Sequence, residues 1–242
     1  EIFLCAALAG MLFALIPALL KIYLNVNEVV STLLLNFIGE YFVNYLVNGP
    51  MRDPSATTNL SASARFSESA WLPHLAVFEP SSANVGVYIA LVLLGAVTFV
   101  FYRTTLGHEI KMVGANGEFA RYAGINPKRT VIKCMCISGA IAGVIGAIEV
   151  TAVQHRLIAG FNPELGFKGI VVSLLAGNHP IGVLFSGIFF GALKNGGTNM
   201  ERMTGVPSAI SSIVEGIIIL VICADFTFRF VRKKRKAERE GT

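Results

Sequence analysis

Apolar residues in this chain gather into long runs that short polar stretches separate. The runs cover 2–22, 28–48, 85–103, 131–152, 166–177, 180–196 and 207–228. A helix needs about 20 apolar residues to cross the hydrocarbon core of a bilayer, and most of these runs reach that length. The pattern therefore predicts an all-α, polytopic helical integral membrane protein with about seven membrane segments, some of them short or broken.

The apolar piece 166–177 is too short to span. As a helix it would be about 18 Å long, against a hydrocarbon core of about 30 Å. The breaker Gly177-Asn178-His179-Pro180 separates it from the next run. We expect either a half-helix or a helix that extends into its flanks, and interrupted helices of this kind recur where they line a transport cavity.

The second run carries a polar residue at every fourth position. These residues are Glu28, Thr32, Asn36, Glu40, Asn44 and Asn48. Four residues advance a helix by about 400°, so the polar ridge stays on one broad face. An ionised residue facing lipid costs about 2.5–3.5 kcal/mol at mid-bilayer. The ridge must therefore face other helices or a water-filled path.

Two explanations of the polar ridge stay open. Interhelical hydrogen bonding is the favoured one for Thr32 and Asn48. For Asn36, Glu40 and Asn44 a role in a translocation path is equally well supported. Glu215, near the middle of the last run, is a further intramembrane carboxylate. The candidate path residues are Thr32, Asn36, Glu40, Asn44 and Glu215.

Composition supports the membrane assignment and excludes several functions. Only 14% of the residues are charged, against about 25% in soluble domains. Mean hydropathy is +0.64. The basic residues lie at the ends of apolar runs, so the net charge of +5 indicates membrane lipid and not nucleic acid as a partner. The sequence has no GxxxxGK[ST], HExxH or GxSxG motif, so we expect no enzymatic activity and no cofactor in this chain.

Lysine and arginine are distributed unequally between the two sides. Fourteen lie on one side: Lys21, Arg103, Lys111, Arg121, Lys128, Arg129, Lys133, Arg229, Arg232, Lys233, Lys234, Arg235, Lys236 and Arg239. Four lie on the other: Arg52, Arg65, Arg156 and Arg202. The asymmetry predicts a cytoplasmic 104–130 loop, a basic cytoplasmic tail at 229–242 and an extracytoplasmic loop at 50–84. It also places Glu1 outside, so we expect further helices upstream.

The cytoplasmic stretch 113–126 predicts a short helix. Gly114 to Gly117 can start it, with Glu118 in the first turn, and Gly124 followed by Asn126-Pro127 can end it. Its apolar face would hold Phe119, Tyr122 and Ala123. Such a helix either lies on the membrane surface or docks into the groove of a soluble partner.

Small residues predict close helix packing at two places. SGAIAGVIGA, at 138–147, places Gly139, Gly143 and Gly146 on one flank, and Gly187 with Gly191 forms a second GxxxG pattern. Small side chains let helix backbones approach closely inside a membrane. We also interpret Cys5, Cys134, Cys136 and Cys223 as packing residues, because all lie in or beside apolar segments.

Several motifs together resemble a known family. GHEIKMVGANGEFARYAGINPKR, SGAIAGVIGAIEV and GFKGIVVSLLAGNHPIGVLFSGIFFGAL are similar to the permease subunits of bacterial ABC importers. The resemblance is to the ribose/simple-sugar and nucleoside branch of the family that includes branched-chain amino-acid permeases. NEVVSTLLLNF, GPMRDP and SESAWLP are similar to nucleoside-uptake permeases, although Gly39-Glu40 and Asn44 depart from the usual apolar pattern.

The resemblance implies a single transmembrane permease domain over 1–242, incomplete at its N-terminus, in the bacterial cytoplasmic (inner) membrane. It implies a second permease subunit, the same or a different chain, together with cytoplasmic ABC ATPase subunits and an extracytoplasmic substrate-binding protein. The stretch 114–125 matches the segment that contacts the ATPase. The implied coupling residues are Gly114, Asn116, Glu118, Arg121, Tyr122 and Gly124.

Three alternatives to a nucleoside importer stay open. Within the same class, the solute could be a simple sugar or a branched-chain amino acid. A proton-coupled secondary transporter would carry its proton on Glu40, Glu149 or Glu215 and would need no ATPase. A membrane scaffold would use the 104–130 loop only to recruit a partner.

Overall fold

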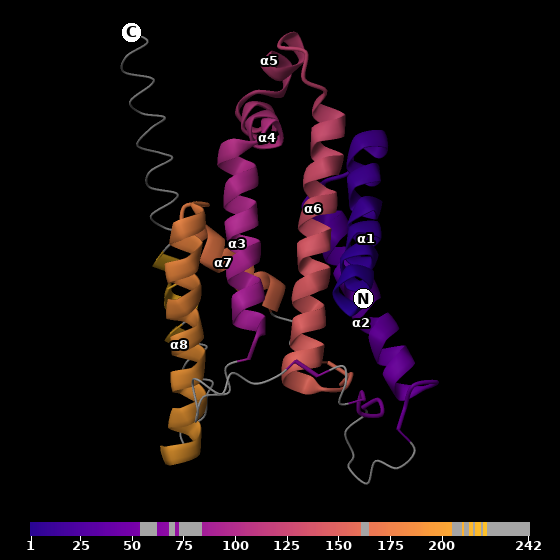
Figure 1. Cartoon of the computed structure of the whole chain (residues 1–242), viewed down its shortest axis with the longest axis vertical. Coiled ribbons are helices and arrows are strands. Elements are labelled where there is room, and N and C mark those ends of the chain that lie inside the picture. Colours follow the sequence, from indigo (N-terminus) through magenta and orange to yellow (C-terminus); the bar gives the residue numbers. More distant parts are fainter. Residues whose placement is uncertain are drawn as a thin grey trace. The chain divides into compact units, whose positions relative to one another are not determined.

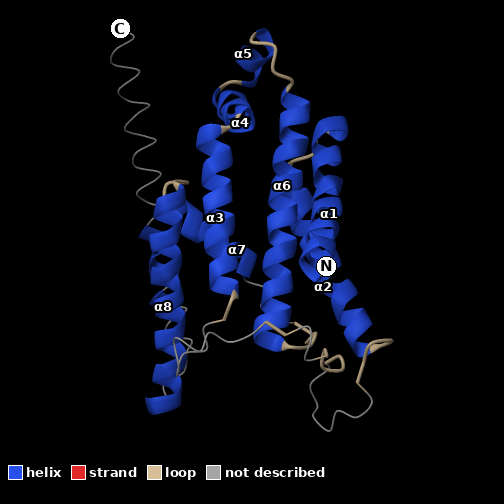
Figure 2. Ribbon diagram, in the orientation of Figure 1, coloured by secondary structure: helices blue, strands red, loops and turns tan. Residues whose placement is uncertain are grey.

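Helices make up the chain wherever the computed structural model describes regular structure. The described residues are 1–53, 62–67, 71–72, 84–160, 165–204, 210, 213–214, 216–218 and 220–221. The elements are α1 (Ile2–Leu24), α2 (Glu28–Asn48), α3 (Gly86–Arg103), α4 (Thr105–Ala115), α5 (Gly117–Tyr122), α6 (Pro127–Ile148), the π-helix η3 (Glu149–Gln154), α7 (Leu165–Leu175) and α8 (Pro180–Thr204). Figure 2 shows this all-helical organisation.

The prediction of a multi-pass helical membrane protein is confirmed. Four described helices are long and apolar enough to cross a membrane: Ile2–Leu24, Glu28–Asn48, Gly86–Arg103 and Pro127–Gln154. α7 is apolar but has only 11 residues, as the break at Gly177 predicts. Glu215 and the basic tail 229–242 lie outside the described residues, as does most of the 50–84 loop.

Two compact units divide the chain. The first covers Glu1–Phe161 and the second Asn162–Thr242. The single permease domain over 1–242 remains a prediction, and the two units are described separately.

Antiparallel packing of α1 against α6 forms the core of the first unit (Figure 1). A Cβ added to Gly143 would lie 2.1 Å from the carbonyl oxygen of Ala6, and one added to Gly139 would lie 2.5 Å from the carbonyl oxygen of Gly10. No side chain larger than hydrogen fits at such separations. The close-packing prediction for Gly139 and Gly143 is therefore confirmed.

The same prediction does not hold for Gly146 within the first unit, and it stays a prediction for Gly187 and Gly191, which belong to the second unit. A Cβ added to Gly146, Gly187 or Gly191 would meet nothing within 4 Å among the described atoms. Gly146 lies three residues beyond Gly143, so it has rotated away from the close contact with α1. Periodicity identified the small-residue flank, but only the crossing point of the two helices decides which glycines touch.

A tight turn joins α1 to α2. Asn25 has left-handed backbone angles (φ 53°), and its N–H donates to the carbonyl oxygen of Leu20. Asn27 then caps α2, because its side-chain oxygen accepts the N–H of Val29 at 2.9 Å. Asparagine suits both positions, since it tolerates left-handed angles and its short side chain satisfies free helix donors.

The far end of α6 meets part of the predicted extracytoplasmic loop. An isolated β-bridge joins Ala62 to Ile158, and a second one, Arg52 with Ser63, lies within the loop itself. Ser63 Oγ accepts the N–H of Leu157 at 3.0 Å, and the Trp71 ring stacks on His155 with centroids 4.4 Å apart. Residues 62–67 therefore lie at the end of the unit where α6 stops and α1 begins.

The polar stretch 108–129 differs from its prediction. It holds two helices, and Gly114 lies in the last turn of α4 instead of starting the short helix. α4 begins early because Thr104 caps it, its hydroxyl accepting the N–H of Gly107 at 3.4 Å. The chain is re-directed at Asn116, which ends α4 and caps α5 with extended backbone angles.

The second unit contains a helical hairpin of α7 and α8. Gly177 (φ 60°) and Asn178 (φ 59°) turn the chain between them. Ser173 Oγ donates to the side-chain oxygen of Asn178 at 2.8 Å, and Pro180 begins α8. α8 extends to Thr204, beyond the predicted end at residue 196.

Candidate functional site

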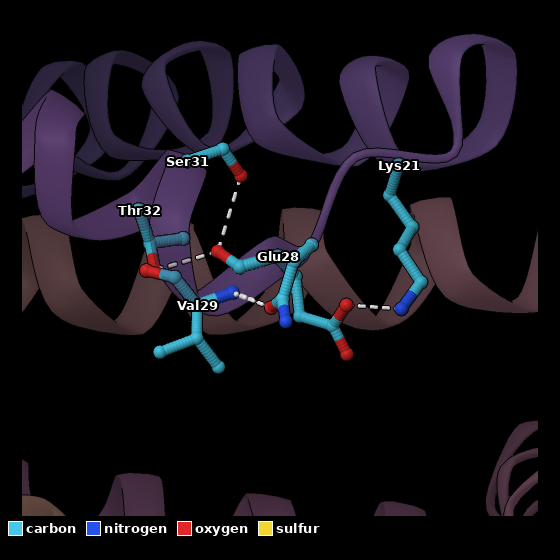
Figure 3. Close-up of polar contacts among 6 residues, drawn as sticks. Lys21, Glu28, Val29, Ser31 and Thr32 are labelled. Carbon is cyan, nitrogen blue, oxygen red and sulfur yellow. Dashed lines mark hydrogen bonds and ion pairs between the residues drawn. The ribbon is translucent and has the colours of Figure 1, made fainter.

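The polar ridge of α2 begins with an ion pair. Lys21 near the end of α1 contacts Glu28 in the first turn of α2 (Figure 3). Both side chains are partly exposed, so the pair connects the two helices without a large gain in stability. It closes the turn that joins α1 to α2.

Thr32 directs its hydroxyl back to its own helix. Its Oγ1 donates to the carbonyl oxygen of Glu28 at 2.8 Å, as Figure 3 shows. Asn48 behaves in the same way, its Nδ2 donating to the carbonyl oxygen of Asn44 at 2.8 Å. The prediction of interhelical bonds for Thr32 and Asn48 is therefore wrong, because both side chains are short enough to reach carbonyls one turn back.

Asn44 connects α2 to the chain beyond α6. Its side-chain oxygen accepts the N–H of Gly160 at 3.0 Å. The predicted translocation residue thus has a structural contact at the end of the unit that also holds residues 62–67.

A cavity of about 310 Å³ lies between α1, α2 and α6. Its lining residues are Gly10, Phe13, Ala14, Pro17, Thr32, Leu35, Asn36, Met135, Ser138, Gly139 and Ala142. The walls are mainly apolar, and Thr32, Asn36 and Ser138 supply the side-chain polar groups. This is the common construction of a small-molecule site, with few polar groups in an apolar wall.

Asn36 and Glu40 are the ridge residues with uncommitted polar groups. Among the described residues, no hydrogen bond or ion pair engages either side chain, and only Asn36 lines the cavity. An amide both donates and accepts, so Asn36 can replace the water around a hydroxyl or a carbonyl of a solute. Of the predicted path residues, the structure brings Thr32 and Asn36 to one cavity. It leaves Glu40 outside that cavity, and Glu215 lies outside the described residues.

Ser138 was missed as a cavity residue. It opens the small-residue run 138–147, which favoured packing as its role. A serine beside a glycine that touches another helix is the one signal that could have identified it, because close approach at Gly139 brings Ser138 to the α1 side of α6. Within the described part of the chain, no cluster of three His, Cys, Asp or Glu residues could hold a metal ion.

α5 lies beyond the ends of α3 and α6 (Figure 1). Asn116 caps it, its side-chain oxygen accepting the N–H groups of Glu118 at 3.0 Å and Phe119 at 3.1 Å. Ala120 is buried, whereas Phe119 is 59% and Tyr122 91% exposed. Two aromatic side chains thus project from a short capped helix whose opposite face is held in place.

We call α5 with its exposed Phe119 and Tyr122 the knob. Several predicted coupling residues lie in it or beside it, and Glu118 and Arg121 are exposed on its surface. Gly124 (φ 81°) turns the chain after α5. The next helix, α6, is then capped by Asn126, whose side-chain oxygen accepts the N–H of Lys128 at 3.1 Å. Asn116 and Gly124 therefore set the course of the backbone at the two ends of α5, whereas the side chains of Glu118, Arg121 and Tyr122 are exposed and can contact a partner.

Glu109 of α4 contacts two residues of α6, and the sequence did not predict this role. Its carboxylate lies 3.7 Å from the ammonium of Lys133 and accepts the hydroxyl of Thr130 at 3.4 Å. α4 contacts α3 as well, so it connects the knob to both neighbouring spans. Glu109 gave no signal in the sequence, because its partners lie 21 and 24 positions away.

Comparison with known proteins supports a common origin along nearly the whole chain. The model of the family described as branched-chain amino acid transport system / permease component matches residues 2–223. The glucose ABC transporter permease protein TsgB13 of Haloferax volcanii is 35% identical over 99% of this chain and 64% of its own length. The guanosine ABC transporter permease protein NupP of Bacillus subtilis is 34% identical over 96% of this chain and 66% of its own length.

The nucleoside ABC transporter permease protein NupB of Lactococcus lactis is 33% identical over 94% of this chain and 64% of its own length. The chain thus spans about two thirds of the length of these relatives. No solved structure matches. Because the family model matches residues 2–223 of the 242 residues, the chain belongs to the family of permease components of the branched-chain amino acid transport system.

Proposed function

We propose that the chain is the permease subunit of an ATP-binding-cassette importer that carries nucleosides or related ribosides. The observation that carries the proposal is the similarity to permeases named for guanosine and for nucleosides over 94% or more of the chain. The chain performs no covalent chemistry in this proposal. ATP hydrolysis belongs to a separate subunit.

The cavity between α1, α2 and α6 is the proposed part of the translocation path in this chain. A riboside has several hydroxyl groups and must exchange water for protein groups as it crosses. Asn36 and Ser138 offer such groups in an otherwise apolar wall, whereas the Thr32 hydroxyl that also lines it is already bonded to the carbonyl oxygen of Glu28. A few weak contacts suit passage better than a tight site, because the solute must also leave. Glu40 and Asn44 remain proposed path residues because they belong to the polar ridge, and Glu215 remains one because it is an intramembrane carboxylate.

α5 is the proposed point of contact with the ATPase. Phe119 and Tyr122 would enter a groove on that subunit, with Glu118 and Arg121 at the rim. A displacement of α5 would move α4, which contacts it directly. It would also move α6, which is joined to α4 through Glu109, and α1, which packs on α6 at the glycine contacts. These links favour α1, α4 and α6 moving together.

The proposal includes the orientation and the partners of the chain. The excess of Lys and Arg supports a cytoplasmic 104–130 loop and C-terminal tail, with 50–84 outside. The partners are cytoplasmic ABC ATPase subunits, a second permease subunit and an extracytoplasmic substrate-binding protein. The location is the cytoplasmic membrane.

A simple sugar is the second candidate solute, because the permease named for glucose is as similar as the nucleoside permeases. The cavity does not separate the two, since amide and hydroxyl groups serve sugars and ribosides alike. The proton-coupled alternative has no support from the relatives, which are named as ABC permeases.

The test is uptake of radiolabelled guanosine in cells that express the complete transport system. Phe119→Ala combined with Tyr122→Ala should abolish uptake and the ATPase stimulation that loaded binding protein causes. The matched control is Tyr23→Ala, which removes a 77% exposed tyrosine from the same side of the membrane. Protein levels in the membrane are measured for every variant.

The outcomes separate the candidates. Excess unlabelled guanosine should compete with uptake, and excess glucose should not. Competition by glucose alone would replace the riboside assignment with a sugar. Uptake that survives the double substitution and follows the proton gradient would contradict an ATP-driven importer.

A further inference from the structure

A second cavity, of about 420 Å³, lies between α3, α4 and α6, and Ser138 of α6 lines both this cavity and the first one. Its lining residues are Leu93, Ala96, Val97, Val100, Phe101, Ile110, Cys134, Ile137, Ser138 and Ile141. α3 and α6 touch each other at few residues, and α4 joins both at one end. The cavity is large enough for a small-molecule ligand or part of a lipid.

Its walls favour an apolar occupant. Only Cys134 and Ser138 carry a side-chain heteroatom, and neither is charged. A hydroxyl-rich solute would lose its water here and find almost no replacement for it. An alkyl chain makes no hydrogen bonds to water, so it would lose none on entering the cavity.

The two walls of the cavity are formed by α3 and α6. Toward the end of the cavity that α4 closes, each of these helices carries a basic residue. On α3, Arg103 lies three residues after Val100 and seven after Ala96, so it extends the lining face of that helix. On α6, Lys133 lies four residues before Ile137 and extends the facing wall.

Lys111 adds a third cation at the junction of α3 and α4. Its ammonium lies 4.3 Å from the centre of the Tyr102 ring, one residue before Arg103. Lys133 is already paired with Glu109, the acidic residue of α4. Within the described residues, no ion pair joins Arg103 or Lys111 to a carboxylate.

We propose that this cavity holds an acyl chain of an anionic phospholipid, with the headgroup phosphate bound by Arg103 and Lys111. An apolar slot that ends in uncompensated cations matches a molecule with an alkyl chain and an anionic head. Basic pockets between spans at the cytoplasmic side are suited to such headgroups. The site requires only that the chain lies in a bilayer, and it does not depend on which solute is carried.

The test measures lipid retained by the complete chain. The protein is reconstituted in vesicles of equal parts phosphatidylglycerol and phosphatidylcholine with identical acyl chains, then extracted in detergent and analysed by native mass spectrometry. Phosphatidylglycerol should be retained over phosphatidylcholine by about fivefold for each cation that acts on it. Arg103→Gln with Lys111→Gln should bring the ratio close to one.

Two controls match these changes. Lys128→Gln removes an exposed cation at the start of α6 and should leave the ratio unchanged. Val97→Trp should fill the cavity and remove the retained lipid, whereas Val92→Trp, at a 70% exposed position of α3 outside the cavity, should not.

Labelling of Cys134 supplies a readout that does not depend on extraction. In a chain with Cys5→Ser, Cys136→Ser and Cys223→Ser, alkylation of Cys134 by N-ethylmaleimide should be several-fold slower in phosphatidylglycerol than in phosphatidylcholine bilayers. Equal retention of the two lipids by the unaltered chain would overturn the proposal. Equal protection of Cys134 in both bilayers would also overturn it, because occupation of the cavity would then not depend on an anionic headgroup.

Discussion

The contact of α1 with α6 and the attachment of α2 are built in opposite ways. α1 and α6 touch backbone to backbone at Gly10, Gly139 and Gly143, so the two helices have almost no freedom to shift. α2 approaches α1 at few residues. It is held mainly near its ends, by the Lys21–Glu28 ion pair and by the bond from Gly160 to Asn44.

The difference indicates which part of the unit can move. Shifting α6 along α1 would break many contacts at once, whereas shifting α2 would break a few polar contacts and change the cavity that contains Asn36. Packed interfaces move as rigid bodies, and weakly attached elements adjust around them. We expect α1 with α6 to form the fixed side of the path and α2 the adjustable side.

The largest effect is expected at the fixed interface. Gly143→Val would place a side chain where a Cβ already lies 2.1 Å from the carbonyl oxygen of Ala6. Overpacking against a rigid backbone should cost about 3 kcal/mol or prevent folding. Thermal unfolding followed by circular dichroism in detergent measures it. Gly146→Val is the control and should be nearly neutral, since among the described residues no atom beyond its own stretch of helix lies within 4 Å of its added Cβ. Equal destabilisation by both would contradict the glycine interface.

The next effect is expected in the cavity without loss of fold. Asn36→Leu should raise the half-saturating concentration for guanosine uptake about tenfold, because about one hydrogen bond to the solute is lost. Thr32→Val is the matched control, since that hydroxyl is bound to the carbonyl of Glu28, and it should change uptake little. A larger effect at Thr32 than at Asn36 would place the solute elsewhere.

A smaller effect is expected at the far attachment of α2. Asn44→Ala removes the acceptor for the N–H of Gly160 and should lower unfolding stability by about 1 kcal/mol. Asn48→Ala, whose amide bonds only within α2, should cost less. Hydrogen exchange at Gly160 reports the contact directly, and unchanged protection in Asn44→Ala would show that the contact does not hold α2.

The smallest effect is expected at the ion pair. Glu28→Gln should lower stability by about 0.5 kcal/mol or less, because both side chains are partly exposed to solvent. Exchanging the charges with Lys21→Glu and Glu28→Lys should restore most of that loss. A loss above about 2 kcal/mol in thermal unfolding would show that the turn between α1 and α2 is fixed more firmly than proposed.

Much of the first unit could be predicted because its signals are local. Apolar runs predicted the spans to within a few residues, whereas the sidedness drawn from the charge asymmetry stays a prediction. The split of 104–130 into α4 and α5 could not be predicted so closely, because Asn116 both ends one helix and caps the next. Nor could the glycine pattern separate Gly143 from Gly146, which differ only in where α1 crosses α6.

The sequence by itself determined that the chain is a multi-pass helical membrane protein, that α2 carries a polar ridge, and that a capped helix with exposed aromatic residues interrupts the spans. Each follows from short-range periodicity and capping. Only the tertiary structure decided which ridge residues are free to act: Thr32 turns back to its own helix, Asn44 holds Gly160, and Asn36 lines a cavity. The bond of Thr32 is local, but Asn44 bonds to an atom 116 positions away, and Asn36 shares its cavity with residues of α6, so spacing along α2 alone contains no information about these two roles.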